Sequence, residues 1–190
     1  MNIYELPTTL NVAGTDYPIR TDFRVIIDIL IAMSDPEMED WERQEVMFQI
    51  IYPEHESVPP ECHNEACKKA AEFIDYNIPS GKRKPKTLDW EQDAPLIIPA
   101  VNKVAGKEVR ALEYLHWWTF LGYFMEIEDG LASQVWAIRQ KKAKGKKLEK
   151  WEKEFERENR ELVQLKRPYS AEVTRKASCK ITSQQYVGGL

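Results

Sequence analysis

The chain has 190 residues, of which 43% are hydrophobic and 31% are charged, and this composition suits a single globular domain with a sizeable core. The opening residues lack a basic head followed by an apolar run, and no segment reaches the ~20 apolar residues of a membrane span. We therefore expect a cytoplasmic protein whose three cysteines, odd in number and without a framework spacing, remain reduced.

Charge is unevenly distributed along the chain. Residues 1–138 contain 12 Lys and Arg against 24 Asp and Glu, whereas residues 139–190 contain 15 against 7. The first part therefore carries −12 and the second +8, which together give the net charge of −4. Such polarity favours contact between the basic end and an acidic surface, which belongs either to the same chain or to a partner.

A small β-hairpin is predicted at the start of the chain. Residues 6–19 form two short stretches around Ala13-Gly14-Thr15-Asp16, where Gly and Asp tolerate the positive φ of a tight turn. Thr21-Asp22 then supplies capping oxygens for a helix over residues 23–33, whose apolar side chains fall on one face.

Two more helices are predicted before a basic loop. Ser34-Asp35-Pro36-Glu37 combines a capping side chain, a proline that a first turn tolerates and a glutamate that can reach back to the cap. We therefore expect a second helix from there to about Ile51, and a third from Pro59-Pro60 through Asn77. Residues 78–88 are rich in Lys, Arg, Pro and Gly, which predicts an exposed loop.

The second half of the chain is also predicted to be helical. Asp89-Trp90-Glu91-Gln92 is typical of a capping box, and the helix after it is expected to bend or break at Pro95 or Pro99. Residues 108–126 are apolar nearly all round, which predicts a central helix that is buried on most sides. Another helix is expected over about 130–142.

A last, amphipathic and basic helix is predicted from Lys146 to about Lys166. Its apolar residues recur at heptad-like positions, and Glu149–Lys153 and Glu156–Arg160 are expected to pair one turn apart. The predicted fold class is therefore mostly α. Its parts are a compact multi-helix domain with an N-terminal β-hairpin (1–143), the charged amphipathic helix (144–167), and an extended or partner-dependent tail (168–190).

Few residues have the spacing that catalysis or metal binding requires. His63 and Cys67 could face one ion from a helix, but structural zinc sites need four well-spaced ligands, so we expect no metal and no cofactor. His116 lies near Glu113 and could be a general base. A hydrogen-bonded core histidine is the favoured interpretation, because no matched nucleophile or phosphate-binding loop accompanies it. We expect a binding protein and not an enzyme.

Two lysine-rich segments, residues 82–86 and 144–147, could contact phosphates. They lack interleaved aromatic side chains, and the acidity of the whole chain argues against a nucleic-acid partner. A solvated surface is the favoured interpretation of both segments.

Aromatic residues are more abundant than a small core needs. Five of the six tryptophans lie within 62 residues: Trp90, Trp117, Trp118, Trp136 and Trp151. Trp117 or Trp118 is expected in the core, and those left at the surface are typical anchors of a binding face. The candidate partner-binding residues are Leu148, Trp151, Phe155 and Leu162 on the last helix, together with Trp136. Packing of this apolar stripe on the domain's own core is an equally good interpretation.

Two parts of the sequence resemble a known protein family. One is the opening LPTTLNVAGTDYPIRTDFR (6–24), and the other is WEQDAPLI (90–97) followed by LEYLHWWTFLGYF (112–124). Their order and separation are similar to those of a family encoded beside the tape measure gene in long-tailed phages of Gram-positive bacteria. The similarity covers roughly residues 6–142.

This resemblance implies a tail assembly chaperone. Such a protein keeps the long tape measure protein soluble in the host cell cytoplasm, helps tail tube subunits polymerise around it, and is absent from the mature virion. The resemblance further implies that the matched motifs determine the fold. Separately, the apolar stripe of the last helix could bind a second copy of the chain instead of the tape measure protein. The alternatives are a structural component of the phage tail and a nucleic-acid-binding phage regulator.

Overall fold

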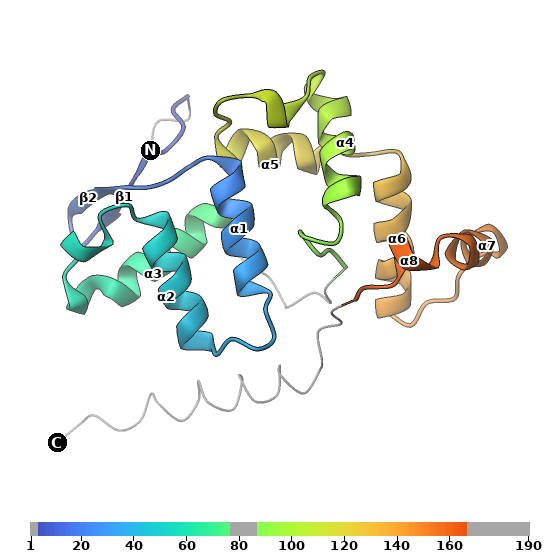
Figure 1. Ribbon diagram of the computed structural model, residues 1–190, viewed down its shortest axis with the longest axis horizontal. Helices are drawn as coiled ribbons and strands as arrows, with labels where there is room; N and C mark the ends of the chain where they lie inside the picture. Colours follow the sequence, from blue (N-terminus) through green and yellow to red (C-terminus); the bar gives the residue numbers. More distant parts are fainter. Residues whose placement is uncertain (1–3, 77–86, 167–190) are drawn as a thin grey trace.

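The structure, a computed structural model, describes residues 4–76 and 87–166. Within these ranges the chain is mostly helical with a two-stranded antiparallel hairpin, as predicted (Figure 1). In chain order the elements are β1 (Thr9–Val12), β2 (Thr15–Pro18), α1 (Phe23–Met33), α2 (Asp40–Ile51), η1 (His55–Ser57), η2 (Pro60–Cys62), α3 (His63–Ile74), α4 (Ala94–Ala105), η3 (Val109–Ala111), α5 (Trp117–Met125), α6 (Leu131–Ala143), α7 (Lys150–Glu158) and α8 (Arg160–Val163).

Some predictions fall beyond these ranges. The tail over 168–190 lies outside the described residues, and so does the loop over 78–88 apart from its last two positions. Within the described ranges, every helix is too short or too polar to cross a bilayer.

The predicted hairpin and first helix are confirmed. Val12 pairs with Thr15 across a two-residue turn, in which Ala13 and Gly14 both have positive φ (49° and 86°), as tight hairpin turns require. Helix α1 occupies the predicted residues. The Asp22 carboxylate accepts a hydrogen bond from the backbone N–H of Arg24 at 3.0 Å, which caps the helix.

Helix α2 ends at Ile51 as predicted but begins at Asp40, so the start predicted at Ser34 is wrong. The Ser34 hydroxyl instead donates to the Leu30 carbonyl at the end of α1, and Asp35 closes a separate turn by accepting from the Glu37 N–H. The actual capping box is formed by Glu39 with the third residue of the helix. The capping pattern at Ser34 therefore predicted a helix start at the turn after α1, whereas the helix starts at the next turn, at Glu39.

Helix α3 begins at His63 and not at Pro59-Pro60. The two prolines belong to the short 3₁₀ segment η2 and the residue before it, and Pro60 occupies a first-turn position where its missing N–H costs nothing. The helix ends at Ile74, and its predicted end at Asn77 lies outside the described residues.

Helix α4 begins at Ala94, later than the predicted Asp89. The Asp89 carboxylate accepts from the N–H groups of Glu91 and Gln92, which closes a turn ahead of the helix. Pro95 therefore falls in the first turn, where proline is tolerated, and the helix continues through Pro99 to Ala105, so of the predicted bend or break the break does not occur.

The central helix is shorter than predicted, because α5 begins only at Trp117. Backbone hydrogen bonds join Phe23 N–H to the Leu115 carbonyl (3.0 Å) and Trp117 N–H to the Thr21 carbonyl (2.7 Å). The Leu115 N–H also donates to the Asp22 carboxylate at 3.1 Å. The chain just before α5 is thus held extended against the start of α1, where it cannot be helical.

The last predicted helix is divided into α7 and α8 at Asn159, whose φ and ψ of −116° and 38° are not helical. Its side-chain amide donates to the Phe155 carbonyl, which ends α7. Helix α6, in contrast, agrees with its prediction. The two predicted ion pairs within the last helix are absent from the described residues, and Glu156 pairs with Lys142 on α6 instead.

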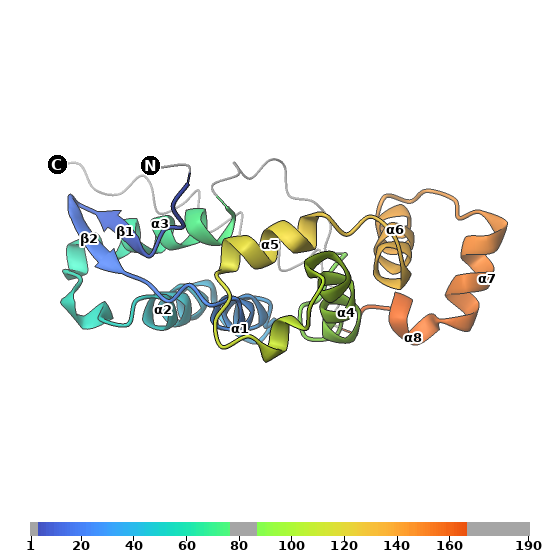
Figure 2. The same ribbon diagram turned by 90° about the horizontal axis from the view of Figure 1, so that it is seen from above.

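The core lies between the hairpin and helices α1 to α5, and α6 extends from one side of it (Figures 1 and 2). A second, smaller cluster of Leu96, Ala132 and Val135 joins α4 to α6. Helix α8 lies next to α6, and α7 lies beyond them at one end of the molecule, as Figure 2 shows. We refer to residues 146–166 as the arm.

Candidate partner-binding surface

An apolar groove of about 190 Å³ lies between α1 and α4. Its walls are two helix faces, because its lining residues follow helical spacing on both elements. The lining consists of Phe23, Arg24, Ile27 and Asp28 from α1, Ala94, Ile97 and Ile98 from α4, and Trp90 from the turn before α4. A space of this size accepts one or two large apolar side chains, such as those along one face of a partner helix.

The two charged residues of the groove differ in their availability. Arg24 forms an ion pair with Asp22 at 2.9 Å and donates to the Leu112 carbonyl at 2.5 Å, so its charge is already compensated. Asp28 is exposed and makes no ion pair with another described residue. The groove therefore has an apolar floor and a negative rim, which favours a partner helix with apolar anchors beside a basic residue.

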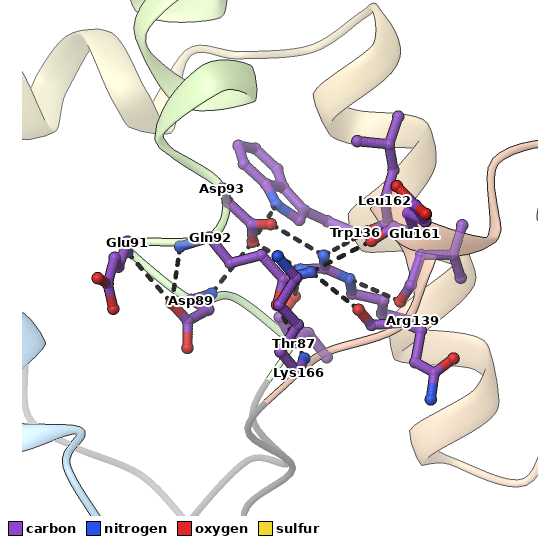
Figure 3. A network of polar contacts seen from close by, with 12 residues as sticks. Thr87, Asp89, Glu91, Gln92, Asp93, Trp136, Arg139, Glu161, Leu162 and Lys166 are labelled. Atoms are coloured by element: carbon purple, nitrogen blue, oxygen red, sulfur yellow. Dashed lines mark hydrogen bonds and ion pairs between the residues drawn. The ribbon is translucent and has the colours of Figure 1, made fainter.

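A buried ion pair connects the start of α4 to α6 (Figure 3), and its α4 member directly precedes Ala94 of the groove wall. Arg139 and Asp93 are almost fully buried and form two hydrogen bonds, at 2.6 and 2.8 Å. The same guanidinium donates to the backbone carbonyls of Thr87, Leu162 and Val163. Because burial of a charge is costly unless it is paired and hydrogen-bonded, this saturated geometry marks Arg139 as a structural clamp on the arm.

Gln92 adds a second attachment for the arm. Its amide N–H donates to the carbonyls of Glu161 (3.3 Å) and Gln164 (2.8 Å), and its amide oxygen accepts from the Lys166 N–H at 2.9 Å. The stretch Trp90-Glu91-Gln92-Asp93 thus supplies one wall residue of the groove and two anchors of the arm (Figure 3). This arrangement positions the end of the described chain beside the groove.

The stretches 6–24 and 112–124 pack directly against each other. Asp22 and His116 form a β-bridge, and the rings of Phe23 and Phe120 stack with centroids 4.5 Å apart. His116 is buried; its Nε2 donates to the Pro7 carbonyl at 3.0 Å, and its Nδ1 accepts from the Trp118 N–H, which caps α5. Phe23 and Phe120 thus belong to the core, and His116 is a hydrogen-bonded core histidine.

Acidification is expected to weaken the fold through His116. Burial holds the pKa of this imidazole below its ordinary value of 6.5, although the hydrogen bond to Pro7 opposes the shift. His116 therefore leaves stability unchanged above pH 6.5. Stability falls as the pH drops from 6.5 through the lowered pKa of the folded chain, because there only the unfolded chain takes up the proton.

Urea unfolding of the wild type and of His116→Asn at several pH values measures this effect. The asparagine oxygen can still cap α5 but cannot titrate, so we expect the variant to lack this part of the acid-induced loss. Equal loss in both proteins between pH 6.5 and 5 would assign the acid sensitivity to other groups.

The tryptophans divide into core and surface residues. Trp117 and Trp118 are both buried, and their indole N–H groups donate to the carbonyls of Ile74 and Phe73 at 2.9 Å. Trp90 and Trp136 are half-buried, and both pack against Phe124. Of the five tryptophans between residues 90 and 151, Trp151 alone is largely exposed, with 55% of its surface accessible.

The predicted partner-binding stripe is split between the interior and solvent. Phe155, Leu162 and Trp136 pack against the small cluster of Leu96, Ala132 and Val135. Leu148 is half-buried. Trp151 is thus the member of the stripe that offers a large exposed apolar side chain, and contact with a partner stays a prediction for the stripe as a whole.

His63 and Cys67 have other contacts in the structure. The His63 ring packs on Phe48 and its Nε2 lies 3.1 Å from the Val58 carbonyl, while the Cys67 thiol faces the Gln44 carbonyl. Among the described residues, no group of three or more His, Cys, Asp and Glu side chains is placed to hold a metal ion.

Two surface features escaped prediction from the sequence. Trp41, the sixth tryptophan, is 68% exposed at the start of α2, among carboxylates. Its position beside Glu39, Asp40 and Glu42 was a usable signal, since a lone aromatic in an acidic stretch has no apolar face to join. The groove gave no such signal, because its walls are about 70 residues apart in sequence.

Comparison with known proteins identifies a phage family. The family model described as "Bacteriophage Gp15 protein" matches residues 3–165. This range includes the groove, the Asp93–Arg139 pair and nearly the whole arm. No curated protein and no solved structure matches the chain.

Proposed function

This chain belongs to the bacteriophage Gp15 protein family, and we propose that it acts as a tail assembly chaperone. In this role it binds the tape measure protein in the host cytoplasm, keeps it soluble, promotes assembly of the tail tube around it, and is absent from the mature virion. The family match supports a phage protein. The chaperone role follows from the resemblance of residues 6–24, 90–97 and 112–124 and from the chemistry of the surface.

The groove between α1 and α4 is the observation that supports this role best. A chaperone for a long helical protein needs to hold apolar side chains reversibly, and helix-in-groove contacts meet this need with a few anchors. The floor of Phe23, Ile27 and Ile97 offers such a site, and the negative rim at Asp28 favours basic residues beside the anchors. We therefore infer that amphipathic helices of the tape measure protein bind here.

A large side chain placed in the groove is expected to prevent binding of the tape measure protein while the core contacts of this chain are kept. Ala94 is half-buried in the groove wall on the first turn of α4, so Ala94→Phe places an aromatic ring in the space for the anchors. We expect at least about a tenfold drop in affinity, because about 1.4 kcal/mol of anchor burial suffices for that. Co-purification of tagged tape measure protein with this variant measures the effect.

Val104→Phe is the matched control. It introduces the same side chain on the same helix at an exposed position that does not line the groove. Recovery of the tape measure protein should match the wild type for Val104→Phe and fall for Ala94→Phe, while thermal unfolding shows that both variants fold. Full recovery with Ala94→Phe would remove the groove from the binding surface.

The alternative roles give different results in separate experiments. A structural tail component would be found by mass spectrometry in purified virions at a fixed ratio to the tube protein, whereas the chaperone should be absent. A nucleic-acid-binding regulator would bind DNA with an affinity that falls steeply with salt concentration.

A further inference from the structure

Two exposed tryptophans lie far apart on the molecule, each beside charges of one sign. Trp41 stands at the start of α2 and Trp151 at the start of α7. In both views α7 lies at one end of the molecule and α2 in the opposite half (Figures 1 and 2). Exposed aromatic side chains of this size are the usual anchors of protein interfaces.

The surface around Trp41 is acidic. Residues 35–45 contain six carboxylates and a single basic residue, Arg43. That arginine is already engaged, since it pairs with Asp40 at 2.7 Å and donates to the Asp35 carbonyl at 2.6 Å. We call this the acidic surface, formed by the exposed residues Glu37, Glu39, Asp40, Trp41 and Glu45.

The surface around Trp151 is basic. Residues 141–153 contain seven lysines and only two glutamates. Lys141 is neutralised by the buried carboxylate of Glu152 at 2.6 Å, and Lys142 by Glu156. The other five lysines are exposed, and none forms an ion pair with a described residue. Together with Trp151 they form the basic surface: Lys144, Lys146, Lys147, Lys150 and Lys153.

We propose that the acidic surface of one copy of this chain binds the basic surface of a second copy. The two surfaces have opposite charge, which steers association, and each offers one tryptophan to be desolvated at the centre of the contact. They lie in opposite halves of one molecule, so a single copy cannot bring them together. Nucleic acid fits these observations less well, since it would match the basic surface alone and be repelled by the acidic one.

A contact between two different surfaces is heterologous. Each copy that joins therefore leaves one acidic and one basic surface free at the two ends, and assembly continues into a ring or an open chain. Such a row of copies could present a row of grooves along a long partner. The assembly itself does not depend on the chaperone role, because it is a property of the purified chain.

Charge-reversal variants of the full chain test this contact by sedimentation velocity at low salt. The base-reversed variant carries Lys146→Glu and Lys150→Glu, and the acid-reversed variant carries Glu37→Lys and Glu45→Lys. We expect the wild type to grow in mass with concentration and to dissociate as salt is added, while each variant alone stays monomeric. A 1:1 mixture of the two variants should associate again, because the intact acidic surface of the base-reversed variant meets the intact basic surface of the acid-reversed variant.

Lys103→Glu with Lys107→Glu is the matched control, because it changes the same charge at two exposed positions outside both surfaces. This variant should assemble like the wild type. Trp151→Ala should weaken assembly at least about tenfold without a change of charge, as expected for a central anchor. Circular dichroism shows whether each variant is folded.

Three results would overturn the proposal. One is a wild-type chain that stays monomeric over the whole concentration range at low salt. Another is a mixture of the reversed variants that fails to associate. The last is a duplex DNA complex that forms through the basic surface while the chain remains monomeric.

Discussion

Arg139→Ala is expected to lower the free energy of unfolding by about 3–5 kcal/mol, the usual cost of removing one partner of a buried ion pair. The substitution leaves the Asp93 carboxylate buried without its cation, and it removes the donor to the carbonyls of Leu162 and Val163. Domains of this size are stable by only about 5–15 kcal/mol, so the loss is a large part of the total. Urea unfolding followed by circular dichroism measures it.

An exposed arginine provides the control for this prediction. Arg157 pairs with Glu154 at 3.6 Å, and both side chains are mostly exposed. Arg157→Ala should therefore cost less than about 1 kcal/mol. In the Arg139→Ala protein we also expect protease to cut the arm faster than the rest of the chain, because the clamp on α8 is gone. Equal stability of the two variants would show that the Asp93–Arg139 pair does not hold the arm.

Trp117→Ala is expected to cost about 3–5 kcal/mol, the range for deletion of a large core aromatic. The side chain is 1% exposed, stacks near Phe120, and donates its indole N–H to the Ile74 carbonyl. The variant loses the apolar contacts of the indole ring and leaves a cavity in their place. It also leaves the Ile74 carbonyl without its hydrogen-bond donor. Trp117→Phe keeps much of the apolar volume and should lose less.

Trp41→Ala removes the same side chain from an exposed position and should change the stability of the monomer by no more than about 0.5 kcal/mol. Thermal and urea unfolding at low protein concentration and high salt compare the variants. A small effect of Trp117→Ala under these conditions would contradict the assignment of Trp117 to the core.

Local signals in the sequence predicted the elements that depend on local contacts. The hairpin was predicted from the tolerance of Gly14 and Asp16 for positive φ, although in the structure Ala13 and Gly14 have it, and α1 was predicted from the Asp22 cap and one apolar face. Helix α6 has both ends near their predicted positions. In each case residues close in the sequence supply the hydrogen bonds that fix the element.

Elements fixed by distant contacts were predicted wrongly. Residues 108–116 have the composition of a buried helix, but they contain only the short 3₁₀ segment η3, and Leu115 and His116 are held extended by hydrogen bonds to the start of α1, more than 90 positions away. The last helix is broken at Asn159, and the carbonyls of Leu162 and Val163 beyond it meet Arg139. Neither partner can be identified from one sequence, since pairing at such separation depends on the whole fold.

The candidate binding surfaces also differ in whether local or distant contacts determine them. Trp151 was predicted at a binding face from its place in an amphipathic stripe, and the structure leaves it exposed. Phe155 and Leu162 share that stripe but pack on the small cluster at α4 and α6, which depends on where the arm folds back. The groove could not be predicted, because neither α1 nor α4 carries it alone.

The solubility of the tape measure protein tests the central claim most directly. The tape measure protein of the same phage is expressed alone, with this chain, and with its Ala94→Phe variant, and its soluble fraction is measured after centrifugation. We expect it to be largely insoluble alone, soluble with the wild-type chain, and again insoluble with the variant. A tape measure protein whose solubility is the same in all three cases would contradict the chaperone role.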